Sequence, residues 1–167
     1  RRESDQKMAG EQKLMAAVIG NNLEGVKAEL DGGAQVDARY PVLDGFNDQH
    51  TPLLVASREG RTDMVKLLLE RGADVNAMEN TFGAVPLHKA TYNGHAEITR
   101  ILARHPGVDL NFQGASNGYT PLHDALWHGF EQCAKILVDA GARLDIPGYD
   151  GKLPLDIARE VFGEQHP

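Results

Sequence analysis

The same segment occurs three times in this chain at a nearly constant spacing. The copies are TPLLVASREGRTDMVKLLLERGADVNA (51–77), VPLHKATYNGHAEITRILARHPGVDLN (85–111) and TPLHDALWHGFEQCAKILVDAGARLDI (120–146). Their first residues lie 34 and 35 residues apart, and a shorter copy, LPLDIAREV (153–161), begins 33 residues later. Self-similarity at this period is the signature of a repeat protein, in which each unit packs mainly against its neighbours. The chain is therefore expected to stack its units into a solenoid.

The repeat template also organises the rest of the chain. A further copy lies at residues 12–38, QKLMAAVIGNNLEGVKAELDGGAQVDA, although its first residues no longer match the TPLH motif. We therefore divide the chain into a polar lead-in at 1–11, a single repeat domain at 12–161 and a C-terminal tail at 162–167. The domain is expected to hold four full repeats, at 12–38, 51–77, 85–111 and 120–146, and a half repeat at 153–161. Residues 39–50 form a long loop.

Each full repeat predicts two helices followed by a polar turn. Thr51 and Thr120 precede prolines, so each hydroxyl is placed to cap a helix whose first residue is the proline. Glycines that tolerate left-handed geometry are expected to end the helices: Gly60, Gly94 and Gly129 the first ones, Gly72 and Gly141 the second ones. The polar turns NTFG, SNG and YDG predict β-hairpin tips between the repeats.

The TPLH and GADVN motifs at this period resemble the ankyrin repeat, over about residues 12–161. The resemblance implies an all-α repeat solenoid, a stack of antiparallel helix pairs from which β-hairpin loops project. Two residues depart from the pattern, since Val85 and Leu153 replace the capping threonine. Each replacement costs on the order of 1 kcal/mol if no other group caps the helix. The loop at 39–50 is also six residues longer than the pattern implies.

The motif histidines are better explained by structure than by chemistry. His123 occupies the TPLH position, and the resemblance implies that it ties neighbouring loops together. His128 lies five residues later, about 140° around a helix, which is a poor arrangement for a metal pair. Cys133 takes an apolar helix position and is expected in the core. We therefore expect no metal, no cofactor and no catalytic residue.

Charge and apolar patterning exclude two further classes of function. The net charge is −7, so bulk electrostatics disfavour nucleic acid. The longest apolar runs are too short to insert into a membrane. The resemblance to ankyrin repeats implies a protein partner instead.

Partner-binding residues are expected where the helix core does not require the residue type. Trp127 and His128 fill two variable positions before a glycine, matched by Arg58–Glu59 and Tyr92–Asn93 in other repeats. The resemblance places these positions on the concave face, and Trp and Tyr dominate binding hot spots. The predicted partner-binding residues are Arg58, Glu59, Phe82, Tyr92, Asn93, Tyr119, Trp127, His128 and Tyr149, with Phe46 in the long loop.

A purely structural explanation remains open for the exposed aromatic residues and for the long loop. Single exposed aromatics are common, and aromatics at hairpin tips can pack on neighbouring hairpins. The loop at 39–50 is either functional or a tolerated insertion, since loop closure penalises extra length only weakly.

The expected function is a non-enzymatic, monomeric scaffold for protein–protein interaction. Three alternatives stay open: a regulatory or targeting domain of a larger protein or secreted effector, a stand-alone bacterial protein that protects or escorts an enzyme, and an accessory that responds to a small ligand or metal. The chain does not begin with Met. A cytoplasmic location is favoured, with the periplasm or secretion as alternatives.

Overall fold

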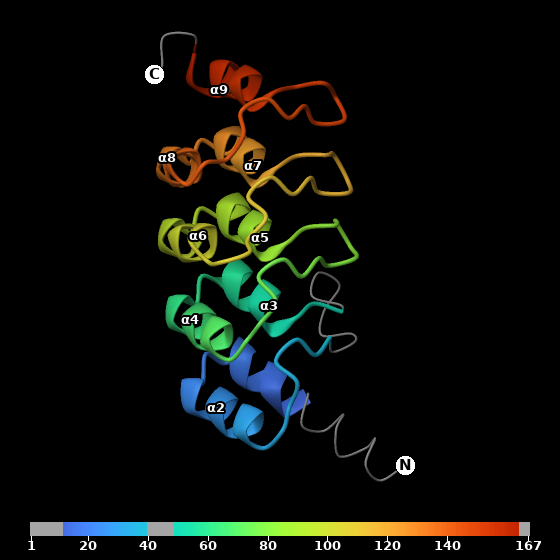
Figure 1. Ribbon diagram of the computed structural model, residues 1–167, viewed down its shortest axis with the longest axis vertical. Helices are drawn as coiled ribbons and strands as arrows, with labels where there is room; N and C mark the ends of the chain where they lie inside the picture. Colours follow the sequence, from blue (N-terminus) through green and yellow to red (C-terminus); the bar gives the residue numbers. More distant parts are fainter. Residues whose placement is uncertain (1–11, 40–48, 164–167) are drawn as a thin grey trace.

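The computed structural model describes residues 12–39 and 49–163 of the chain, and these form a stack of helix pairs (Figure 1). Residues 12–19 are helical. The helices that follow are α2 (Leu23–Asp31), α3 (Pro52–Glu59), α4 (Thr62–Glu70), α5 (Pro86–Tyr92), α6 (Ala96–Ala103), α7 (Pro121–Trp127), α8 (Glu131–Asp139) and α9 (Pro154–Phe162).

Two parallel rows of helices build the stack. Helices α3, α5, α7 and α9 form one row, α2, α4, α6 and α8 form the other, and the loops between repeats project to one side (Figure 1). Each helix of the first row packs on the next one, and α3, α5 and α7 also pack on the helix that follows them in sequence. The predicted repeat solenoid is confirmed.

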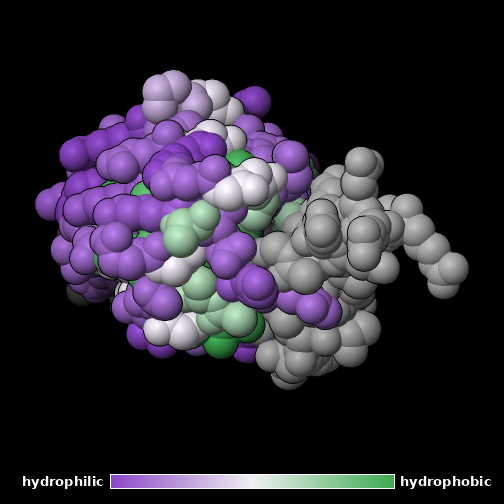
Figure 2. Space-filling view, turned by 90° about the horizontal axis from the view of Figure 1, so that it is seen from below, coloured by the Kyte–Doolittle hydropathy of each residue, from purple (hydrophilic) through white to green (hydrophobic). Residues whose placement is uncertain are grey.

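The end of the stack at the first repeat presents a mainly polar surface. Seen from this end, the described residues are largely hydrophilic, with only small and separate apolar patches (Figure 2).

Helices that lack a capping threonine are capped from the other direction. Thr51 accepts a backbone N–H bond through its hydroxyl, as predicted. At Val85 the side chain of His88 reaches back instead, and its Nδ1 accepts from Val85 N at 3.2 Å. At Leu153 the carboxylate of Asp156 accepts from Leu153 N at 2.8 Å. Each of these bonds satisfies one backbone donor. The helices that follow Val85 and Leu153 are therefore partly capped without a threonine.

The predicted helix-ending glycines adopt left-handed backbone and also make room for the next repeat. Gly60, Gly94 and Gly129 have φ values of 75°, 74° and 73°. A Cβ on Gly60 would stand 2.7 Å from the His95 ring, and one on Gly94 would stand 3.0 Å from the Phe130 ring. Any larger residue at these two positions is therefore penalised by strain and by collision.

The predicted hairpins form as tight loops, and none of the described residues is in a β-strand. One backbone bond of 2.9 Å closes each loop, from Glu79 N to Ala84 O, from Gly114 N to Tyr119 O and from Gly148 N to Lys152 O. We name the segments 79–84, 114–119 and 148–152 the hairpin loops. A single closing bond is too little for a ladder. Neighbouring loops are also joined by backbone bonds, from Ser116 N to Phe82 O at 3.3 Å and from Tyr149 N to Asn117 O at 2.8 Å.

Buried histidines connect two of the hairpin loops, 114–119 and 148–152, to the first helix of the preceding repeat. His88 Nε2 lies 2.8 Å from Tyr119 O, and His123 Nε2 lies 2.9 Å from Lys152 O. Each Nδ1 accepts a backbone N–H bond at the start of its own helix, so the proton is on Nε2, which donates to the carbonyl. These imidazoles are therefore neutral, as burial favours.

Two asparagines that precede hairpin loops, Asn76 and Asn111, connect repeats as well. Asn76 Oδ1 accepts from Asp109 N, and Asn111 Oδ1 accepts from Arg143 N, both at 2.8 Å. Each residue bonds the backbone of the following repeat, about one repeat further along the chain. The sequence pattern thus supplies a second line of inter-repeat bonds, beside the histidines.

The buried His88 should make the fold sensitive to acid. Burial lowers the pKa of His88 from 6.5 to about 4, so the unfolded chain binds a proton that the folded chain excludes between these values. Stability is therefore unaffected above pH 6.5 and falls as the pH drops from 6.5 to 4, by about 3 kcal/mol for this residue. His88→Leu, which copies Leu54 of an earlier repeat, should flatten this dependence in urea unfolding measured at several pH values.

A control separates loss of stability from loss of the titrating group. Ile98→Val should lower the free energy of unfolding by about 1 kcal/mol and keep the pH dependence of the wild type. The assignment to His88 is wrong if both variants show the same dependence on pH.

Candidate partner-binding groove

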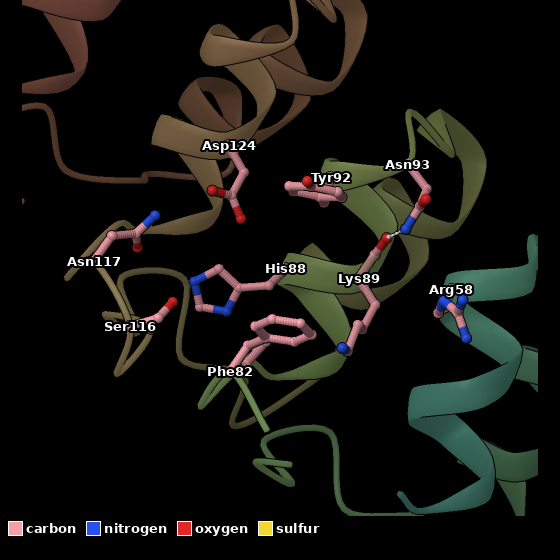
Figure 3. A pocket seen from close by; sticks show the side chains of 11 residues that line it. Arg58, Phe82, His88, Lys89, Tyr92, Asn93, Ser116, Asn117 and Asp124 are labelled. Atoms are coloured by element: carbon pink, nitrogen blue, oxygen red, sulfur yellow. Dashed lines mark hydrogen bonds between the residues drawn. The ribbon is translucent and has the colours of Figure 1, made fainter. Parts of the chain in front are cut away.

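A pocket of about 410 Å³ opens beside the first row of helices, between α3, α5, α7 and two hairpin loops (Figure 3). Its wall combines side chains that differ in chemistry: Arg58, Phe82, His88, Lys89, Tyr92, Asn93, Ser116, Asn117 and Asp124. We name it the groove pocket. Because three consecutive repeats line it, the pocket exists only in the assembled stack.

The structure brings five of the predicted binding residues to this region. Arg58, Phe82, Tyr92 and Asn93 line the groove pocket, and Trp127 holds the position on α7 that Tyr92 holds on α5. The exposed fractions are 43% for Phe82, 56% for Tyr92 and 50% for Trp127. Large aromatic surface thus faces solvent on adjacent repeats, next to a cavity.

Neighbouring side chains hold Tyr92 in place. The ring of His128 meets the ring of Tyr92 edge-on at 4.4 Å and stacks on Phe130 at 5.7 Å. Asn93 Nδ2 donates to Lys89 O at 2.8 Å, which fixes the amide beside the pocket. Side chains ordered in this way lose little entropy when a ligand binds.

Two of the predicted partner-binding residues, Tyr119 and Tyr149, pack against neighbouring parts of the stack. Tyr119 is only 8% exposed: its ring stacks on His123 at 4.6 Å, and its hydroxyl donates to Asp150 at 2.6 Å. Burial and this bond raise the pKa of Tyr119 to about 12. Tyr149 is 68% exposed, yet a Cβ on Gly118 would stand 2.4 Å from its ring. Tyr119 is therefore buried by packing on its neighbours. Tyr149 packs on the neighbouring loop with one face of its ring and is otherwise exposed.

The remaining predicted residues lie at the margin or outside the described residues. Glu59 is exposed at the end of α3, and its carboxylate lies 3.8 Å from Arg58 Nη1. Phe46, with most of the long loop, lies outside the described residues. The two ends of that segment are close, because Arg39 Nη1 donates to Gln49 O at 3.0 Å.

A buried ionic cluster below the pocket was missed in the sequence. Glu79 is fully buried, and its Oε1 accepts from the backbone N–H groups of Phe82 and Ala84, both at 2.8 Å. Its Oε2 lies 3.7 Å from Lys89 Nζ and 3.4 Å from His50 Nε2. The only signal in the sequence is a carboxylate directly before a Gly-bearing turn, which is too common to be informative.

This cluster positions the aromatic part of the pocket. Glu79 shapes the hairpin loop that carries Phe82, and the Lys89 ammonium lies 5.4 Å above the Phe82 ring. Burial lowers the pKa of Lys89, and the attraction of Glu79 opposes that change. The cation and its carboxylate partner are therefore both needed to keep the loop and the ring in place.

Asp124 on α7 is the acidic group of the groove pocket. Its side chain is half-buried, and desolvation raises the pKa of its carboxyl to about 7, an effect that the positive charge of Lys89 reduces. In Figure 3 the carboxylate enters from α7 and points toward His88, beside Tyr92.

Metal and membrane chemistry find no support in the described part of the chain. It contains no group of three or more His, Cys, Asp or Glu side chains that could hold a metal ion. Within the same residues no helix is both long and apolar enough to cross a membrane. Cys133 is a free thiol buried beside Thr99, whose hydroxyl lies 3.7 Å from its sulfur.

Comparison with known families agrees with the stack of helix pairs. A family model described as ankyrin repeats (3 copies) matches residues 2–79 and 77–147. The chain therefore belongs to the ankyrin-repeat family. Ankyrin repeats are in general non-catalytic modules for protein–protein interaction.

Relatives with this likeness include proteins of very different kinds. The chain is 32% identical over 108 residues to serine/threonine-protein kinase 12 of Arabidopsis thaliana, which covers 62% of the chain and 22% of the relative. It is 31% identical to a putative ankyrin repeat protein of Rickettsia bellii, over 53% of the chain and 44% of the relative. Rabankyrin-5 of Mus musculus is 35% identical over 57% of the chain, which is 9% of its own length. The chain thus matches less than half of each of these relatives.

The Glu79–Lys89 pair gives a test of the buried cluster. Glu79→Gln keeps the two loop bonds but leaves the Lys89 charge buried without its partner, so it should destabilise the fold by about 3 kcal/mol in urea unfolding. The double variant Glu79→Gln/Lys89→Met removes both charges and should recover most of this loss. Equal stability of the single and double variants would show that the pair is not coupled.

Proposed function

We propose that this chain binds a partner protein through a concave surface made of the groove pocket, Tyr92, Trp127 and the tip of the Phe82 loop. The observation that carries the proposal is the pair of half-exposed aromatics at equivalent positions of α5 and α7, beside a cavity. Isolated exposed aromatics need no explanation, whereas aromatics in register next to a pocket resemble the anchors of a binding hot spot.

The stack supports such binding by being rigid before the partner arrives. Histidine and asparagine bonds fix neighbouring repeats, and His128 holds Tyr92. A partner segment then loses its own freedom but orders little of this surface. The polar groups around the aromatics, Arg58, Glu59, Asn93 and His128, are assigned to specificity, because an unpaired polar group disfavours the wrong partner.

The same surface can bind a partner whether the chain is a stand-alone protein or part of a longer one. The relatives named above are mostly much longer than the matched region, which favours an interaction module within a larger protein. In that setting the groove recruits a target for the rest of the protein, and in a stand-alone protein it holds the target by itself.

Peptide selection tests the groove without knowledge of the partner. Peptides selected from a random displayed library on the wild-type protein should lose affinity for Tyr92→Ala/Trp127→Ala by roughly thirtyfold or more, the loss of one full hot spot. Fluorescence anisotropy with labelled peptides measures this loss. Circular dichroism verifies that the double variant is folded.

Val138→Ala is the matched control for the loss of exposed apolar surface. Val138 is 44% exposed on α8, in the other row of helices. Its truncation should leave affinity unchanged. If the selected peptides bind the Tyr92/Trp127 double variant as tightly as the wild type, the proposed surface is wrong.

A further inference from the structure

The Asp124 carboxylate is the acidic side chain in the wall of the groove pocket. It is half-buried in the wall formed by α7, and none of the described residues donates a hydrogen bond to it or forms an ion pair with it. Figure 3 shows it pointing into the space bounded by Tyr92, His88 and Asn117. A carboxylate that has lost part of its hydration without gaining a donor is unfavourable.

The charged and titratable groups around Asp124 are engaged elsewhere. His88 uses both ring nitrogens, one accepting from Val85 N and one donating to Tyr119 O. Lys89 pairs with the buried Glu79 and lies over the Phe82 ring. Arg58, across the pocket on α3, lies within 3.8 Å of Glu59.

The polar neighbour on the loop side is Asn117, which is held in place through its amide oxygen. The Asn117 Oδ1 accepts from Tyr119 N at 3.0 Å. The pocket therefore contains cations that already have carboxylate partners and one acid that has none. Its unmet requirement is a donor, and preferably a cationic one, since the net charge of the chain is −7.

We propose that the groove pocket binds an arginine side chain of the partner, with the guanidinium paired to Asp124 and lying against the Tyr92 ring; this inference rests on the proposed binding role of the groove. A guanidinium donates two parallel bonds to one carboxylate and stacks on aromatic faces. The wall of the pocket offers both, a carboxylate and an exposed phenol ring from adjacent repeats.

Arginine fits this wall better than the other charged side chains. An aspartate or glutamate of the partner is repelled by Asp124, and Lys89 is already neutralised by Glu79. A lysine ammonium satisfies the charge but is a point donor that uses one carboxylate oxygen at a time. The flat guanidinium therefore uses more of the pocket than an ammonium does.

The pairing also predicts how affinity depends on pH. Burial raises the pKa of Asp124 to about 7, so part of the population is protonated at neutral pH and cannot pair with a cation. Arginine stays charged throughout. Binding therefore strengthens as the pH rises from 6 to 8, because fewer protein molecules must release a proton first.

The test starts from the peptides selected for groove binding. They should share an arginine at one position, and replacing it by citrulline, which keeps the shape but removes the charge, should weaken binding to the wild type at least tenfold. Asp124→Asn should weaken binding of the arginine peptide by a similar factor and leave the citrulline peptide unaffected. Asp139→Asn, which removes an exposed carboxylate at the end of α8, is the control and should change neither affinity.

The possible results separate this inference from the proposed function. Peptides that depend on Tyr92 and Trp127 but share no arginine would overturn the inference and leave the groove function standing. An arginine peptide that binds Asp124→Asn as tightly as the wild type would overturn it as well. If the selected peptides do not depend on Tyr92 and Trp127, both proposals fail. The citrulline comparison uses the wild-type protein, so it decides the matter even if a variant is poorly folded.

Discussion

The structure depends on the hydrogen bond from a buried histidine to the backbone of the next hairpin loop. In a solenoid each unit has too little core to fold by itself, so the interface between units carries the stability. His88 and His123 each satisfy a helix start with one nitrogen and the following loop with the other. One side chain thereby fixes the helix within a repeat and the distance to the next repeat. The groove pocket follows from that spacing, because its walls belong to successive repeats.

The sequence predicts the framework well because local chemistry decides it. The capping threonine, the proline at the first helical position and the left-handed glycines act within a few residues, and the structure has them where the motif places them. Cys133 is in the core as its position in the repeat predicted. The predicted hairpins were correct as loops, although the described residues form no strands there, because one closing bond does not make a ladder.

The sequence is less informative about the pocket, because contacts between repeats determine it. Tyr92 and Trp127 were predicted by comparing equivalent positions of the repeats, and of the two only Tyr92 lines the pocket. Tyr119 was assigned to the surface by its place near a turn, but its ring stacks on His123 and is buried. Glu79 and Lys89 gave no usable signal, because their pairing joins a loop to a helix ten residues later.

The placement of the pocket across three repeats has a mechanical consequence. Arg58, Tyr92 and Asp124 come from α3, α5 and α7, so a small change in the rotation between successive repeats moves all three walls relative to one another. The width of the pocket thus depends on how these three repeats are rotated relative to one another. Conversely, a side chain held between these walls acts as a spacer between the three repeats that supply them.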